Sequence, residues 1–204
     1  MGKLIAIVGV SGVGKTSLVK ALSAAGDFAT GLEEHNDRPF QLLFDQDKGY
    51  ALHNQVDYFL LRARQEKTLR AEPKPGLIDG GLDVDFHGFT RLFQSRGYLN
   101  DAELDLLARL YAQLRTALPM PELVIYLTAS DDVIRERLAG RDRVNIATAP
   151  DAGLLKKYLE EWLDTLPQDR VLYLDVSESE LSYINELPVL LGYINGLMQT
   201  ENDR

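Results

Sequence analysis

The chain has 204 residues, a formal net charge of -9 and no cysteine, which excludes disulfide frameworks and thiolate metal sites. The negative charge argues against a nucleic-acid partner held on a basic face. No apolar run approaches the ~18 residues of a membrane span, and the chain enters a strand pattern too early for a signal peptide, so we expect a cytoplasmic protein with no membrane partner.

Short apolar runs alternate with helix-like stretches along the chain. The apolar runs predict five strands, at residues 4–8, 28–32, 76–79, 123–127 and 171–176. Helical spacing and capping residues predict helices at residues 15–25, 40–70 with a break at Gly49, 100–117, from 130 onward, and 186–198. Strands separated by helices imply right-handed crossovers. The sequence therefore predicts an α/β fold, with one domain over residues 1–204 built on a doubly wound, five-stranded parallel sheet with flanking helices.

A glycine-rich loop is expected between the first strand and the first helix. Residues 9–16 read Gly-Val-Ser-Gly-Val-Gly-Lys-Thr and fit the phosphate-loop pattern G-x-x-x-x-G-K-[ST] at every fixed position. The glycines let consecutive backbone N–H groups turn around an anion, and the helix N-terminus adds positive potential. A glycine-rich turn without a ligand is the alternative. The residues expected to bind ATP are Gly9, Ser11, Gly12, Val13, Gly14, Lys15, Thr16 and Ser17.

The same loop predicts a magnesium site. Lys15 is expected to reach the β- and γ-phosphates of ATP, and the Thr16 hydroxyl to coordinate Mg²⁺. A neighbouring strand should end in an acidic residue that holds the ion directly or through water. Asp79 is the candidate, although an Asp beside two glycines can also be a turn former. The expected cofactors are thus ATP and Mg²⁺.

Intervals between polar residues beyond the loop form a second pattern. Gln55 and Arg62 lie seven residues apart on one predicted helix, about two turns, so both side chains face one pocket. Asp85 lies six residues after Asp79, and residues 136–143 read Glu-Arg-Leu-Ala-Gly-Arg-Asp-Arg. In this order, from residue 3 to about residue 162, the chain resembles the deoxynucleoside kinase family, especially its bacterial purine-preferring members.

The resemblance implies an acceptor site for a small-molecule nucleoside. The resemblance makes Glu33, at the end of the predicted second strand, the catalytic base. Glu34 is the alternative, because neighbouring strand positions point to opposite faces and only one can serve. It gives Gln55 hydrogen bonds to a base edge, with Arg62 and Asp85 as a buried, mutually neutralising pair. The substrate-binding residues implied are Glu33, Phe44, Gln55, Arg62 and Asp85.

The resemblance also implies an arginine-rich lid at about residues 137–150. Arg137, Arg141 and Arg143, together with Lys15, would neutralise the charge on the transferring phosphoryl group. Lys15, Arg137 and Arg141 are accordingly expected to act in catalysis with Glu33, and Arg141 and Arg143 to bind ATP. An exposed cationic helix end is the alternative for these arginines.

Three positions depart from the family's pattern, all on the acceptor side. Gly80 stands where the family has an arginine that contacts the acceptor. Phe44 replaces a tyrosine that holds the sugar 3′-hydroxyl, and residues 144–146 replace a glutamate of the lid. These departures make ATP binding a safer expectation than phosphorylation of a deoxynucleoside.

Three further polar residues belong to this side of the molecule. Arg38, five residues after Glu33, is a candidate to substitute for the missing arginine. Asp83 and His87 are polar groups that the family's pattern does not require. They would shape a site for another acceptor or lie at the surface, and a surface position is the interpretation we favour for His87.

The residues lead to three hypotheses for function. The first is ATP-dependent phosphorylation of the 5′-hydroxyl of a deoxynucleoside. The second is a kinase of the same fold acting on a nucleotide or another small hydroxyl acceptor, and the third is a non-catalytic nucleotide-binding module. The helices around Gln55 and Leu106 could also pack a homodimer, although apolar helix faces are more often part of a core.

Overall fold

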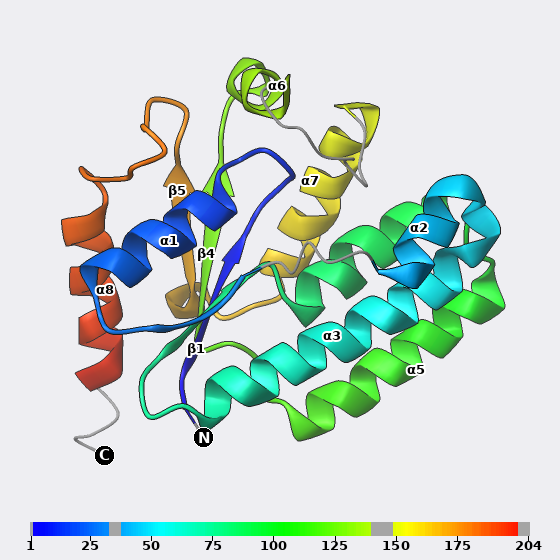
Figure 1. Cartoon of the computed structure of the whole chain (residues 1–204), viewed down its shortest axis with the longest axis horizontal. Coiled ribbons are helices and arrows are strands. Elements are labelled where there is room, and N and C mark those ends of the chain that lie inside the picture. The colour runs from blue at the N-terminus through cyan, green and yellow to red at the C-terminus, as the bar shows by residue number, and fades with distance from the viewer. Residues whose placement is uncertain (1, 33–37, 140–148, 200–204) are drawn as a thin grey trace.

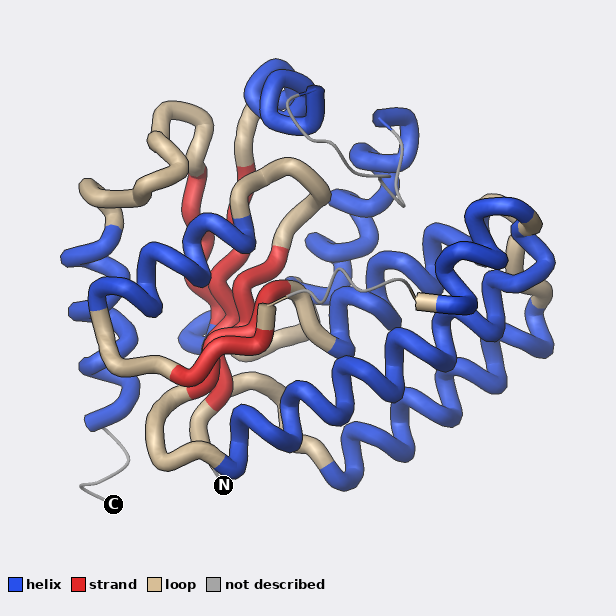
Figure 2. The backbone as a smooth tube through the Cα atoms, in the orientation of Figure 1, coloured by secondary structure: helices blue, strands red, loops and turns tan. Residues whose placement is uncertain are grey.

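A computed structural model describes residues 2–32, 38–139 and 149–199 (Figure 1). Its centre is a sheet of five parallel strands in the order β2-β3-β1-β4-β5. The strands are β1 (Leu4–Val8), β2 (Ala29–Gly31), β3 (Gly76–Asp79), β4 (Leu123–Thr128) and β5 (Val171–Asp175). The order confirms the predicted doubly wound fold, and each predicted strand is found within two residues of its expected ends. Figure 2 shows the strands in red, side by side at the centre of the helices.

Helices cover both faces of the sheet, with α1 and α8 on one side and α3, α5 and α7 on the other (Figure 1). Their bounds are α1 (Lys15–Ala25), α2 (Pro39–Gln46), α3 (Ala51–Ala71), α4 (Arg91–Ser95), α5 (Asp101–Ala117), α6 (Asp131–Ala139), α7 (Ala149–Leu163) and α8 (Leu187–Gln199). Within the described residues there are also two short 3₁₀ turns, η1 (Lys48–Tyr50) and η3 (Gln168–Arg170), and a π-helical segment, η2 (Val84–Thr90). None of the helices in the described ranges is long and apolar enough to cross a membrane.

Local signals in the sequence account for two helix boundaries. The predicted break at Gly49 is confirmed, because η1 separates α2 from α3 and the Asp47 side chain accepts a hydrogen bond from the Gly49 N–H at 2.8 Å. The predicted start of the helix at residue 100 is also confirmed, by a capping box between Asn100 and Glu103. The Glu103 N–H donates to Asn100 Oδ1 at 3.0 Å, and the Asn100 N–H donates to Glu103 Oε2 at 2.8 Å.

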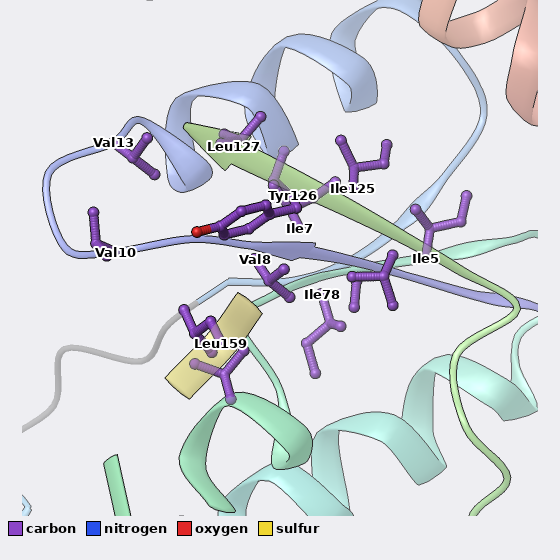
Figure 3. Packing of buried hydrophobic residues seen from close by; sticks show 14 of the residues in the cluster. Ile5, Ile7, Val8, Val10, Val13, Ile78, Ile125, Tyr126, Leu127 and Leu159 are labelled. Carbon is purple, nitrogen blue, oxygen red and sulfur yellow. The ribbon is translucent and has the colours of Figure 1, made fainter. Parts of the chain in front are cut away.

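The core lies on both faces of β1, β3 and β4. All five residues of β1 are buried, as expected for a central strand covered by helices on both sides. Figure 3 shows the side chains of β1 and β4 packed together with Ile78 of β3 and Leu159 of α7. Because parallel strands end at the same edge, this core provides a rigid base for the loops that follow β1 and β3.

Candidate functional site

The loop after β1 has the backbone that its glycines predict. Gly9, Gly12 and Gly14 have φ angles of 145°, 88° and 112°, in the region that favours glycine. A Cβ at Gly9 would lie 2.6 Å from the Leu127 carbonyl oxygen, and one at Gly14 would lie 2.2 Å from the Tyr183 hydroxyl. Side chains are therefore excluded at Gly9 and Gly14 both by conformation and by space, so a ligand can approach the backbone closely there.

The polar residues at the end of the loop lie where a triphosphate and a cation would be held. Lys15 Nζ donates to the carbonyl oxygens of Gly9 and Val10 at 3.0 and 3.1 Å, so its side chain folds over the loop. The Thr16 hydroxyl donates to Asp79 Oδ2 at the end of β3. The structure thus brings together the two residues expected to hold Mg²⁺, and a hydroxyl and a carboxylate are the oxygen donors that this ion prefers.

Arg137, at the end of α6, contacts the backbone of the phosphate loop. Its Nη1 donates to the Val13 carbonyl oxygen at 2.7 Å. Its Nη2 donates to the carbonyl oxygens of Val176 and Ser179, at 3.1 and 2.9 Å. The guanidinium therefore ties the phosphate loop to the segment that follows β5. The resemblance placed this arginine in the lid and gave no indication of these three carbonyl contacts.

Gln55, Arg62 and Asp85 meet as the resemblance implies. Arg62 Nε donates to Asp85 Oδ2 at 3.1 Å, which confirms the expected ion pair. Gln55 Nε2 donates to the Thr90 hydroxyl at 2.9 Å and to the Asp85 carbonyl oxygen at 3.3 Å. All three are buried, with 2 to 4% of their surface exposed. A buried amide beside a neutralised ion pair is suited to hydrogen-bond a flat polar molecule such as a nucleobase.

The turn that joins Asp79 to Asp85 has an unusual backbone. Gly80 and Gly81 have φ angles of 82° and 119°, and η2 then continues as a π-helix over Val84–Thr90. A Cβ at Gly80 would lie 3.4 Å from Arg62 Nη2. Gly80 therefore has a backbone conformation that residues with side chains rarely adopt, which the sequence pattern alone did not reveal.

Phe44 lies on α2, and Arg38 directly precedes that helix. Phe44 is 2% exposed and packs against Phe93 and Tyr98, with ring centroids 4.7 and 6.0 Å away. Arg38 Nη2 donates to the Asp57 carbonyl oxygen at 2.9 Å, and its guanidinium lies over the Tyr58 ring. These contacts give Phe44 a place in the core and attach Arg38 to α3. A contact of either residue with an acceptor stays a prediction.

His87 is partly buried against α5 and α7 and is not an exposed surface side chain, so our preferred interpretation from the sequence was wrong. Its ring stacks on Trp162 of α7 with centroids 5.5 Å apart, and its Nε2 is 3.2 Å from the Tyr111 hydroxyl. Burial, together with the nearby positive charges of Arg91 and Arg115, lowers the pKa of His87 to about 4. The sequence missed this because Trp162 and Tyr111 come from helices far along the chain.

We expect His87 to make the protein less stable in mild acid. Its pKa falls from 6.5 unfolded to about 4 folded, so between these values the unfolded state gains a proton that the folded state resists. The free energy of unfolding should therefore drop as pH falls through this window, by roughly 2–3 kcal/mol from this group. Urea unfolding of the wild type and of His87→Phe, which keeps a ring against Trp162, should show a smaller drop in the variant. Parallel pH profiles would contradict the assignment.

Several predicted site residues lie outside the described residues. They are Glu33, Glu34, Arg141, Arg143 and the lid positions 144–146. Their roles stay predictions from the sequence.

Comparison with known proteins links the chain to one family. The model of the family described as deoxynucleoside kinase matches residues 5–187. A deoxyadenosine kinase of Dictyostelium discoideum is 29% identical over 143 residues, which cover 70% of this chain and 58% of the relative. A deoxyadenosine/deoxycytidine kinase of Bacillus subtilis is 27% identical over 143 residues, covering 69% of this chain and 66% of the relative. The chain thus matches less than two thirds of the length of these two relatives.

Solved structures show the same fold. A deoxyadenosine kinase from M. mycoides with the products dCMP and dCDP bound has a TM-score of 0.76, with 95% of this chain and 99% of that chain covered. The same kinase with bound dCTP has a TM-score of 0.78 over the same shares of the two chains. Sequence identity to both is 18%, so this likeness establishes the fold.

Proposed function

Because the chain belongs to the deoxynucleoside kinase family, we propose that it transfers the γ-phosphoryl group of ATP to the 5′-hydroxyl of a deoxynucleoside. One observation carries the proposal. Asp79 ends β3 beside Thr16 of the phosphate loop, and the turn that starts directly after it leads to Asp85, the partner of Arg62. A group suited to phosphates and a group suited to a base are thus joined by one short segment.

The donor would bind along the phosphate loop. Backbone N–H groups of residues 9–16 would surround the β-phosphate, and Lys15 would exchange its contacts with Gly9 and Val10 for phosphate oxygens. Thr16 and Asp79 would hold Mg²⁺, which when bound neutralises charge on the β- and γ-phosphates. Within the described residues no cluster of three or more His, Asp or Glu side chains could hold a metal ion. Phosphate oxygens and water would therefore complete its coordination.

The acceptor would bind across α3 and η2. Gln55 would hydrogen-bond the base edge, and the Arg62–Asp85 pair would supply further donors and acceptors without a net charge. Glu33 would accept the proton of the 5′-hydroxyl as that oxygen attacks the γ-phosphorus, with Glu34 as the alternative base. The two curated relatives are both named for deoxyadenosine, and one of them also for deoxycytidine, so deoxyadenosine is the first acceptor to test.

The arginines that follow β4 would have two different roles. Arg141 and Arg143 would contact the phosphates of ATP and neutralise the transferring group. Arg137 would instead hold the phosphate loop in place, because it donates a hydrogen bond to the Val13 carbonyl oxygen. A direct contact between Arg137 and a phosphate oxygen, as the sequence suggested, would require these bonds to break.

A kinase of the same fold with another small hydroxyl acceptor is the second candidate. The observation that favours it is the turn at Gly80. This residue has no side chain, and a Cβ added to it would lie 3.4 Å from Arg62 Nη2. Without the arginine that the family has at this position, the site would suit an acceptor whose binding does not depend on that positive charge.

Binding of the two substrates can be tested separately by thermal unfolding. A ligand at about 100 times its Kd stabilises the folded state by about 2.7 kcal/mol, which for a chain of this size raises Tm by roughly 5–10 °C. We expect such a rise with ATP·Mg²⁺ and, independently, with deoxyadenosine. Lys15→Met should lose the rise with ATP·Mg²⁺ and keep the rise with deoxyadenosine. A protein that responds to ATP·Mg²⁺ and to no deoxynucleoside would favour the second candidate or a module without turnover.

A further inference from the structure

A buried ionic cluster lies beneath the turn between β3 and η2. Arg115 of α5 donates from Nε and Nη2 to the two oxygens of Asp83, at 2.9 and 2.7 Å. The same guanidinium donates from Nη1 and Nη2 to the two oxygens of Glu66, at 2.8 and 3.0 Å. Glu66 is 0% and Asp83 2% exposed. One arginine thus holds two buried carboxylates, each through two hydrogen bonds.

The two carboxylates belong to the elements that carry the acceptor residues. Glu66 lies on α3 one helical turn after Arg62, and Asp83 lies two residues before Asp85. Glu66 Oε1 also accepts a hydrogen bond from the Leu82 N–H at 3.3 Å. Arg115, on α5, therefore links α3 to the turn before η2. Both of its partners are close in sequence to the Arg62–Asp85 pair: Glu66 follows Arg62 on α3, and Asp83 precedes Asp85.

The turn needs such support because little in its own sequence fixes it. Gly80 and Gly81 have positive φ angles and no side chains to restrict them. The π-helix that follows is a rare conformation that persists where the surroundings determine it. Tyr111 of α5 adds to this support, since its hydroxyl donates to Asp83 Oδ1 at 2.6 Å and its ring stacks on Phe86 of η2 at 4.2 Å.

From these contacts we propose that Arg115 is a positioning residue of the acceptor site. It holds Asp83 and Glu66, and through them it sets the placement of Asp85 relative to Arg62 and Gln55. The proposal rests on the proposed function, because it assigns Arg115 to the binding of the deoxynucleoside. Arg115 touches neither substrate; it acts through the two elements that it joins.

The test compares Michaelis constants in variants that weaken the contact of Arg115 or Tyr111 with the buried carboxylates. Arg115→Lys keeps the positive charge and loses the planar fork that serves both carboxylates. We expect its KM for the deoxynucleoside to rise about 10-fold, the scale seen when residues that support binding groups are changed, with the KM for ATP unchanged. Tyr111→Phe removes one hydrogen bond to Asp83 and should raise the same KM by a smaller factor, which keeps the test available if Arg115→Lys does not fold.

Arg70→Lys is the matched control. Arg70 lies on α3, is 3% exposed and pairs with Glu122 at 3.0 Å, at the end of the helix far from Gln55. It should lower Tm and leave both KM values unchanged. An unchanged deoxynucleoside KM in Arg115→Lys or Tyr111→Phe, or an equal rise in Arg70→Lys, would overturn this inference alone. Absence of turnover by the wild type on any deoxynucleoside would overturn the proposed function and this inference with it.

Discussion

Replacement of Glu33 with glutamine should lower kcat for the deoxynucleoside by about 10²- to 10⁴-fold, the contribution of a positioned general base. The 5′-hydroxyl must lose its proton as it attacks the γ-phosphorus, and glutamine has no basic oxygen to accept that proton. The Kd for ATP should remain within about two-fold of the wild type, because the base acts on the acceptor and not on the donor. Single-turnover phosphoryl transfer and equilibrium binding of ATP measure the two quantities separately.

Glu34→Gln is the natural control for that experiment. The sequence puts both carboxylates at the end of the predicted second strand, where neighbouring side chains would point to opposite faces, so we expect only one of them to serve as the base. We expect Glu34→Gln to keep near wild-type kcat. A large loss in Glu34→Gln with none in Glu33→Gln would move the base to Glu34. Two variants with wild-type kcat would contradict a carboxylate base at this position altogether.

Arg62→Met should destabilise the folded protein by about 3–5 kcal/mol, because it removes the guanidinium that pairs with the buried Asp85 carboxylate. The Arg62 and Asp85 side chains are 5% and 6% exposed, so water cannot replace the lost contact without local rearrangement. Domains typically have only about 5–15 kcal/mol of stability, which makes this a large fraction. Urea unfolding of Arg62→Met against the wild type measures the loss.

The double variant Arg62→Met, Asp85→Leu separates stability from binding. Removal of both charges leaves no unpaired buried ion, so most of the lost stability should return. Binding of the deoxynucleoside should not return, since the donors and acceptors of the pair are gone. A double variant that binds the nucleoside normally would show that Arg62 and Asp85 serve only the fold. Wild-type stability in Arg62→Met would show that the pair is not buried as the structure describes.

Features set within one element could be predicted from the sequence. The phosphate loop is a local pattern, and the φ angles of Gly9, Gly12 and Gly14 are those that its glycines allow. The meeting of Gln55 and Arg62 at one place follows from the period of a single helix. The Arg62–Asp85 pair crosses two elements, and it was reached through the resemblance to a family and not through spacing.

Contacts between distant elements could not be predicted. Arg115 reaches Glu66 and Asp83 across 49 and 32 residues of sequence, and helical spacing carries no information over such intervals. Arg137 was expected to neutralise charge on the transferring phosphoryl group. Its hydrogen bonds instead go to backbone carbonyl oxygens, and a sequence pattern does not predict such contacts. The π-helix at η2 depends on the packing around two glycines, so its sequence gave no signal for it.

The measurement that tests the central claim most directly is ADP release with ATP·Mg²⁺ and each of the four deoxynucleosides, with the product identified by mass spectrometry. The proposed function predicts turnover on at least one of them, with a 5′-monophosphate as product and loss of that turnover in Glu33→Gln. Thermal protection by ATP·Mg²⁺ with no turnover on any of the four would contradict it, and would direct the search to another acceptor or to a module that binds nucleotide without transferring phosphate.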